Sequence, residues 1–268
     1  MDILLYTVML LLGLVGSFFS GLLGIGGAII NYPLLLYVPD LLRVAHFNPQ
    51  EVSSISMLQV LFASFAGVLA FRKLSDVKVI HKGLVLYMGT SILVGSLLGG
   101  VASKYLPHST INLVYGVLAV IALVLMLIPP KGHAANEHES ELLYNKWIAV
   151  GSAFSVGVVS GIVGAGGAFI LIPIMLTVLR IPTRVTIASS LAIVFISAIG
   201  GTIGKLTTGH IPFLPTLFTV VGSLIGAPIG SKISKKMNVK ALRYGLVVLI
   251  SITAIKIWSS LLYMYRYM

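Results

Sequence analysis

The sequence contains no cysteine, which excludes disulfides, thiol redox chemistry and cysteine-ligated metals. Acidic residues are scarce as well, with seven Asp and Glu against 18 Lys and Arg. Pumps and cation transporters usually keep a carboxylate inside the membrane. We expect every acidic residue, and all six histidines, in loops, at the terminus or at segment ends, which disfavours a cation carrier. The acidic residues are Asp2, Asp40, Glu51, Asp76, Glu137, Glu139 and Glu141.

Signatures of catalysis are also missing from the sequence. It has no HExxH metal motif, no recognisable nucleophile–base pair and no nucleotide-binding motif. We therefore expect neither an enzyme nor a bound metal or cofactor. The net charge of +11 fits basic loops beside apolar spans, as the positive-inside rule predicts, better than it fits a nucleic-acid partner.

Apolar sequence, in contrast, is abundant. Only 9% of the residues are charged, whereas a soluble domain carries about 25%. Residues 3–39 and 147–179 contain no charged side chain. About 20 apolar residues span the ~30 Å hydrocarbon core of a bilayer as a helix. The sequence thus predicts an all-α, polytopic protein embedded in a lipid bilayer, with further apolar runs that begin at Val52, Gly83, Ile111, Val185, Ile211 and Leu242.

The chain repeats itself. The stretch SGLLGIGGAIINYP at residues 20–33 corresponds to SGIVGAGGAFILIP at residues 160–173. Later elements follow in the same order, including VGSLLGG from Val94 and VGSLIGA from Val221. This pattern predicts two transmembrane repeats, residues 1–128 and 147–268, joined by a polar cytoplasmic linker at 129–146.

Each glycine cluster interrupts an apolar run that is too long for one span and short for two. The first run is therefore either one broken crossing or a hairpin of two short helices. With five segments per half and both termini on one side, 13 of the 18 basic residues lie on the other side. With four crossings per half they divide nine to nine. Only the odd count obeys the positive-inside rule. We expect inverted repeats with ten segments, about eight of them full spans, and outward-facing termini.

The glycine motifs are the main candidate site. If each turns a hairpin inside the bilayer, inversion brings the two tips together near the midplane. A new helix would begin beyond each turn, and its first N–H groups lack partners and carry a partial positive charge. Two such N-termini can bind an anion without a lysine. Tight helix packing is the alternative role for these glycines. The residues concerned are Gly26, Gly27, Gly166 and Gly167.

Neutral polar residues in the apolar segments are further candidates. Hydroxyls and amides can donate to anionic oxygens without adding a buried charge, although ordinary interhelical hydrogen bonding is the alternative. The sequence places no Lys or Arg inside the predicted spans except Lys256, so we expect a monoanionic group at the tips. The Gly-xxx-Gly pairs Gly95/Gly99 and Gly222/Gly226 instead predict helix packing. The polar candidates are Asn31, Ser56, Gln59, Ser189 and Ser190.

These motifs resemble the sulfite exporter TauE/SafE family of membrane proteins. The resemblance rests on the twin glycine motifs, on ASSL at 188–191, on GKLTTGHI at 204–211 and on GSLIGAPIGSKI at 222–233. In the first half, SISM replaces the usual Thr/Ser-Ser/Asn-Leu element. The resemblance implies a carrier of a sulfur-containing anion, such as sulfite, sulfoacetate or another sulfonate, in a bacterial-type inner membrane.

The predicted function is a secondary transporter of a small anion by alternating access between inverted repeats. Two alternatives stay open. One is a membrane scaffold or assembly subunit that does not transport, and the other is a carrier of non-sulfur organic anions. The expected partners are the anionic substrate and the lipid bilayer, and a homodimer is compatible with the sequence.

Overall fold

The computed structural model of the protein describes residues 2–23, 28–74, 81–127, 144–209 and 211–234, with residues 244, 247–248, 251–252, 254–256 and 258–259 near the C-terminus. These residues form helices and contain no strand, which confirms the predicted all-α class. In chain order, the helices are α1 (Asp2–Leu23), α2 (Ala28–Leu41), α3 (Pro49–Leu74), α4 (Lys82–Ala102), the short 3₁₀ helix η2 (Ser103–Tyr105), α5 (His108–Leu127), α6 (Lys146–Val163), α7 (Ala168–Thr177), α8 (Thr183–Leu206) and α9 (Phe213–Ser234).

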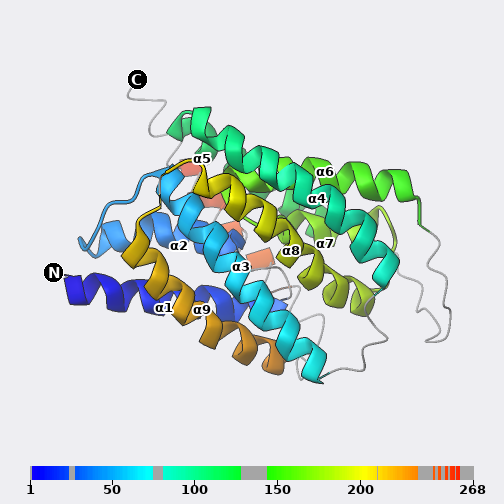
Figure 1. The fold of residues 1–268 in the computed structure, drawn as a ribbon, viewed down its shortest axis with the longest axis horizontal. Coiled ribbons are helices and arrows are strands. Elements are labelled where there is room, and N and C mark those ends of the chain that lie inside the picture. Colours follow the sequence, from blue (N-terminus) through cyan, green and yellow to red (C-terminus); the bar gives the residue numbers. More distant parts are fainter. Residues whose placement is uncertain are drawn as a thin grey trace.

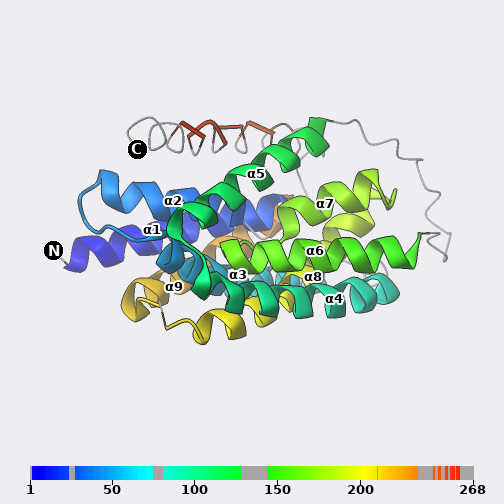
Figure 2. The same cartoon turned by 90° about the horizontal axis from the view of Figure 1, so that it is seen from above.

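Both glycine motifs separate two helices. Helix α1 ends at Leu23 and α2 begins at Ala28, while α6 ends at Val163 and α7 begins at Ala168. The prediction that a helix starts beyond each motif is confirmed. With 14 and 10 residues, α2 and α7 are only about 21 and 15 Å long, so both are shorter than the apolar core of a bilayer. Each contacts the helix before it (Figure 2). Gly26, Gly27 and most of the predicted linker lie outside the described residues.

Helices α3 and α8 form the centre of the bundle. They contact each other, and they run between an α1–α9 pair and an α4–α6 pair (Figure 1). Within the apolar stretch of α3 and of α8, 67% is buried, against 33–44% in α1, α4, α6 and α9. Helices α3 and α8 are therefore the most enclosed of these six helices.

Small residues bring the outer helix pairs into backbone contact. A β-carbon added at Gly222 or Gly226 of α9 would overlap the carbonyl oxygens of Leu10 or Leu14 in α1. Gly95 and Gly99 of α4 meet the backbone of α6 in the same way. The packing role predicted for the Gly-xxx-Gly pairs is thereby confirmed.

Six helices of the described chain are long and apolar enough to cross a membrane: α1, α3, α4, α6, α8 and α9. Helix α5 adds a shorter apolar stretch, His108–Ile121. Large apolar side chains cover the outside of the bundle, as lipid contact requires; on α4 these include Leu86, Val94 and Leu98. Helix lengths and composition therefore fit a multi-pass membrane protein.

Candidate functional site

The second glycine motif turns tightly between α6 and α7. The N–H groups of Gly164 and Ala165 both donate to the carbonyl of Ser160, which closes the end of α6. Gly166 and Gly167 then adopt positive φ angles of 63° and 79°, which only glycine adopts without strain. Gly167 is the N-cap of α7 and offers no side chain to cap the helix. The start of α7 is thus bare backbone.

This turn lies at the middle of the central helices. A β-carbon at Gly166 would lie 2.6 Å from Cγ1 of Val60 in α3 and 3.2 Å from Cγ1 of Val194 in α8. Val60 and Val194 each stand about halfway along their helices. Helix α7 therefore begins beside the middle of the two most enclosed helices.

Two amides meet beside this depth. Asn31, in the first turn of α2, and Gln59, next to Val60 in α3, are both buried. A β-carbon at Gly16 of α1 would overlap Asn31 Oδ1 and lie 3.2 Å from Gln59 Nε2. The glycine thus makes room for both side chains. Gln59 Nε2 donates to the carbonyl of Gly13 and to Ser17 Oγ, each at 3.3 Å.

Several polar atoms in this region lack a hydrogen-bond partner. They are Asn31 Nδ2 and Oδ1, Gln59 Oε1, and the hydroxyls of Ser20 and Ser56. Leaving a buried donor or acceptor unsatisfied costs about 1–3 kcal/mol, so a bound ligand that pairs with it recovers that free energy. We call Ser17, Ser20, Asn31, Ser56 and Gln59 the central polar cluster. Its unpartnered donors, Asn31 Nδ2 and two hydroxyls, suit the oxygens of an anion.

The remaining predicted residues lie elsewhere or face other groups. Ser189 Oγ accepts a hydrogen bond from the N–H of His81 at 3.3 Å, which ties α8 to the start of α4. Ser190 is buried in α8. Near Gly167, an added β-carbon would lie 3.2 Å from Ser160 Oγ and 2.9 Å from Val156 Cγ1. The structure therefore places Asn31 near Gln59, and Gly166 against Val60, the neighbour of Gln59. Ser189 instead pairs with His81.

One charged residue contradicts the prediction that Lys256 is the only basic residue within the spans. Lys205 lies in the last turn of α8, inside the apolar stretch Ser189–Leu206, and is 1% exposed. Its ammonium donates to Ser103 Oγ at 2.7 Å and to the carbonyl of Ile162 at 2.9 Å. The positions of the charges along the sequence predict that this span ends before Lys205. In the structure, Ser103 at the start of η2 and Ile162 near the end of α6 supply the oxygens that hold its ammonium inside the protein.

The described acidic side chains stay away from the central polar cluster. Asp40 pairs with His46 at 3.1 Å on the surface. Glu51 accepts from the N–H of Asn48, and Asn48 accepts from the N–H of Glu51, which caps the start of α3. Within the described chain, no group of three or more His, Asp or Glu side chains could hold a metal ion.

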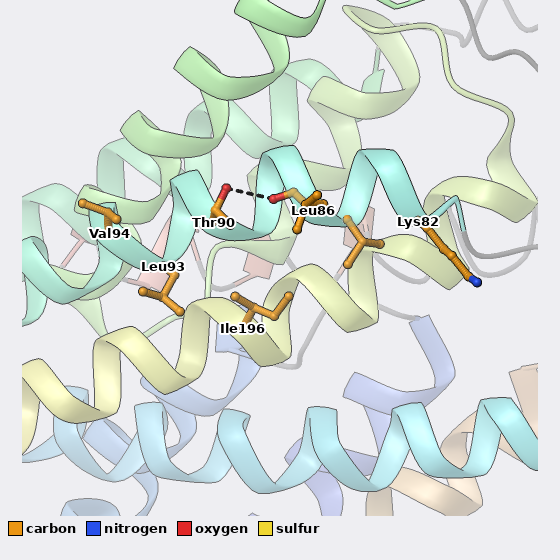
Figure 3. Close-up of a pocket in the computed structure, with 7 residues that line it drawn as sticks. Lys82, Leu86, Thr90, Leu93, Val94 and Ile196 are labelled. Atoms are coloured by element: carbon orange, nitrogen blue, oxygen red, sulfur yellow. Dashed lines mark hydrogen bonds between the residues drawn. The ribbon is translucent and has the colours of Figure 1, made fainter.

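A groove of about 500 Å³ lies between α4 and α8, but it is a poor anion site (Figure 3). Apart from Lys82, its wall is apolar, and the hydroxyl of Thr90 is already bonded to the carbonyl of Leu86 at 2.8 Å. None of the central polar cluster lines it. The lining residues are Lys82, Val85, Leu86, Thr90, Leu93, Val94 and Ile196.

Sequence reasoning missed the contribution of α1. Its residues Gly13, Gly16, Ser17 and Ser20 stand at positions i, i+3, i+4 and i+7 and so share one helix face. That face contacts the amides of α2 and α3 and also the backbone of α9. The spacing of small and hydroxyl residues was the available signal, although it does not tell which helix it faces.

Comparisons with known proteins cover almost the whole chain. A family model described as "Sulfite exporter TauE/SafE" matches residues 9–257. A probable membrane transporter protein of Xylella fastidiosa (strain 9a5c) is 30% identical over 263 residues, which are 92% of this chain and 93% of that protein. Probable membrane transporter protein YunE of Bacillus subtilis (strain 168) is 24% identical over 273 residues, 96% and 97% of the two chains. No solved structure matches the chain.

Proposed function

Because the chain belongs to the sulfite exporter TauE/SafE family, and its relatives are named probable membrane transporters, we propose that it is a secondary transporter of a small sulfur-containing anion. The substrate class is sulfite, sulfoacetate or another sulfonate. The observation that carries this proposal is the central polar cluster, in which the amide nitrogen of Asn31 and the hydroxyls of Ser20 and Ser56 are buried without partners. Neutral donors in that position favour an anion over a cation.

The substrate lies between the glycine turns and the central polar cluster in this proposal. Gly166 and Gly167 expose the first N–H groups of α7, whose helix dipole favours negative charge. Gly26 and Gly27 would do the same for α2. Asn31, Ser56 and Gln59 would bind the anion's oxygens, and Ser189 and Ser190 would belong to the path through α8. Desolvating a second full negative charge would cost much more, so a monoanionic group fits best.

Alternating access between inverted repeats is the proposed mechanism. It is supported by the packing, since α1 with α9 mirrors α6 with α4 when each half is matched to the other. It is also supported by two arginines with positive φ, Arg43 after α2 (54°) and Arg180 after α7 (53°). In this arrangement ten segments include about eight full spans, the linker is cytoplasmic and both termini face outward from the plasma membrane. Non-helical turns at midplane depth are tolerated because they line such a cavity.

A counterflow assay in proteoliposomes tests the proposal. Vesicles that contain the protein and are loaded with unlabelled sulfite should accumulate labelled external sulfite. Vesicles that lack either the protein or the internal sulfite should not. Sulfoacetate, taurine and acetate are each tested in the same way, as the loaded and as the labelled compound. Counterflow of labelled acetate, without counterflow of any sulfur-containing anion, would assign a carrier of non-sulfur anions. Absence of counterflow with every anion, in protein that melts cooperatively, would favour the scaffold.

A further inference from the structure

Lys205 holds an unusual position for a lysine. It is buried at the end of α8, and both of its acceptors, Ser103 Oγ and the carbonyl of Ile162, are uncharged oxygens. A lysine ammonium has three donors, so one remains without a protein partner. In the described part of the chain, Asp40 and Glu51 are occupied by His46 and Asn48 and do not pair with it.

Its positive charge is only partly compensated. Removing an ammonium from water costs several kcal/mol unless an opposite charge faces it. The carbonyl end of α6 offers a partial negative charge, equivalent to about half an elementary charge. The two uncharged oxygens do not require a charged donor, because they would accept hydrogen bonds from an uncharged one equally well. When the amine is protonated, its charge at this place therefore leaves a net attraction for an anion.

A line of polar side chains leads from Lys205 to the central polar cluster. Ser53 Oγ donates to the same Ile162 carbonyl as Lys205, at 2.9 Å. Ser56 and Gln59 follow Ser53 at intervals of three along α3, a rise of about 9 Å. Both are buried, and Ser56 Oγ and Gln59 Oε1 have no partner.

A second unsatisfied hydroxyl accompanies the lysine on α8. Thr202 is 6% exposed, its Oγ1 has no partner, and it precedes Lys205 by three residues on the same helix face. Eleven residues, or about 16 Å of helix, separate Lys205 from Val194 beside the glycine turn. This group is therefore separate from the glycine turn at the start of α7.

We propose that Lys205 and Thr202 form a second binding site for a sulfur oxyanion, between the central polar cluster and the membrane face at which α8 ends. This inference rests on the proposed transport function. The free donor of the ammonium and the Thr202 hydroxyl bind the anion's oxygens as it enters or leaves on that face. No lysine occupies the matching place in α3, where Phe71 stands, so the site serves one face only.

The test measures sulfite transport from each face separately in oriented proteoliposomes. Lys205→Met removes the charge, Lys205→Arg keeps it, and Lys104→Met removes an exposed lysine at the same end of the bundle. Loss of a hydrogen bond to a charged group predicts a KM about tenfold or more higher for K205M on the face at which α8 ends. The KM on the opposite face, and both values for K205R and K104M, should stay close to those of the unmodified protein.

Thermal unfolding with and without sulfite separates binding from folding. A purely structural lysine would lower the melting temperature and impair both faces equally, and either that result or an unchanged KM for K205M would overturn the site. If the unmodified protein does not transport sulfite, the proposed function fails. In that case the second site is retained only if sulfite raises the melting temperatures of the unmodified protein and of Gln59→Ala, but not that of K205M. Any other result overturns it.

Discussion

The buried polar side chains at the centre of the described bundle are amides and hydroxyls rather than charged groups. Asn31 has no partner for either side-chain atom, and Gln59 uses its nitrogen but not its oxygen. Gly16 is the residue that allows this arrangement, since any side chain there would displace the Asn31 amide. The placement of the Asn31 amide therefore depends on the absence of a side chain at Gly16 as much as on Asn31 itself.

Removing these groups should weaken anion binding without unfolding the protein. Ser56→Ala and Gln59→Ala should each cost about 1–2 kcal/mol of binding free energy, roughly 5- to 30-fold in Kd, if they bind a charged oxygen. Ser64→Ala is the matched control, because that buried hydroxyl of α3 already donates to the Val60 carbonyl at 2.6 Å. Titration calorimetry with sulfite measures the three variants. Equal effects for Ser56 and Ser64 would argue against a site at Ser56.

At the scale of helices, glycines on one helix can serve opposite purposes. On α6, a β-carbon at Gly157 would lie 2.6 Å from the Ile92 carbonyl oxygen of α4, whereas one at Gly151 would meet nothing within 4 Å. The first glycine permits helix contact, and the second only lowers helix propensity.

Alanine at these two positions should therefore shift stability in opposite directions. Gly157→Ala should destabilise the protein by about 1–3 kcal/mol, because the helices must separate. Gly151→Ala should leave stability unchanged or raise it by up to about 1 kcal/mol, the difference in helix propensity. Thermal unfolding of the purified variants in detergent compares them. A similar loss in both would show that Gly151 has a packing role.

Patterns within one helix could be predicted from the sequence, and contacts between helices could not. The breaks at the two glycine motifs and the packing of Gly95 or Gly222 follow from local composition and spacing. The burial of Lys205 does not, because it depends on oxygens that η2 and α6 bring from distant parts of the chain. Likewise, nothing within α3 indicates that Gln59 bonds to α1 rather than facing the second half.

For the whole molecule, the proposed topology makes a direct prediction. Cysteines introduced at Ser75 and Asn238 should react with a membrane-impermeant reagent from the same side, and one at Ser109 from the other. The natural chain has no cysteine, so the background is zero. Labelling of Ser75→Cys and Asn238→Cys from opposite sides would exclude five segments per half.

The glycine contacts between outer helices also bear on how the protein is made. Helix α1 packs against α9, and α4 against α6, so each close pair joins one helix from either side of the linker. During synthesis the ribosome releases α1 long before its partner, which begins only at Phe213. Until then, the small-residue face of α1 is covered by lipid, which fills such a groove poorly. Fragments 1–128 and 147–268 should accordingly be degraded when expressed singly and accumulate when co-expressed. The smallest unit that can mature is therefore the two repeats together.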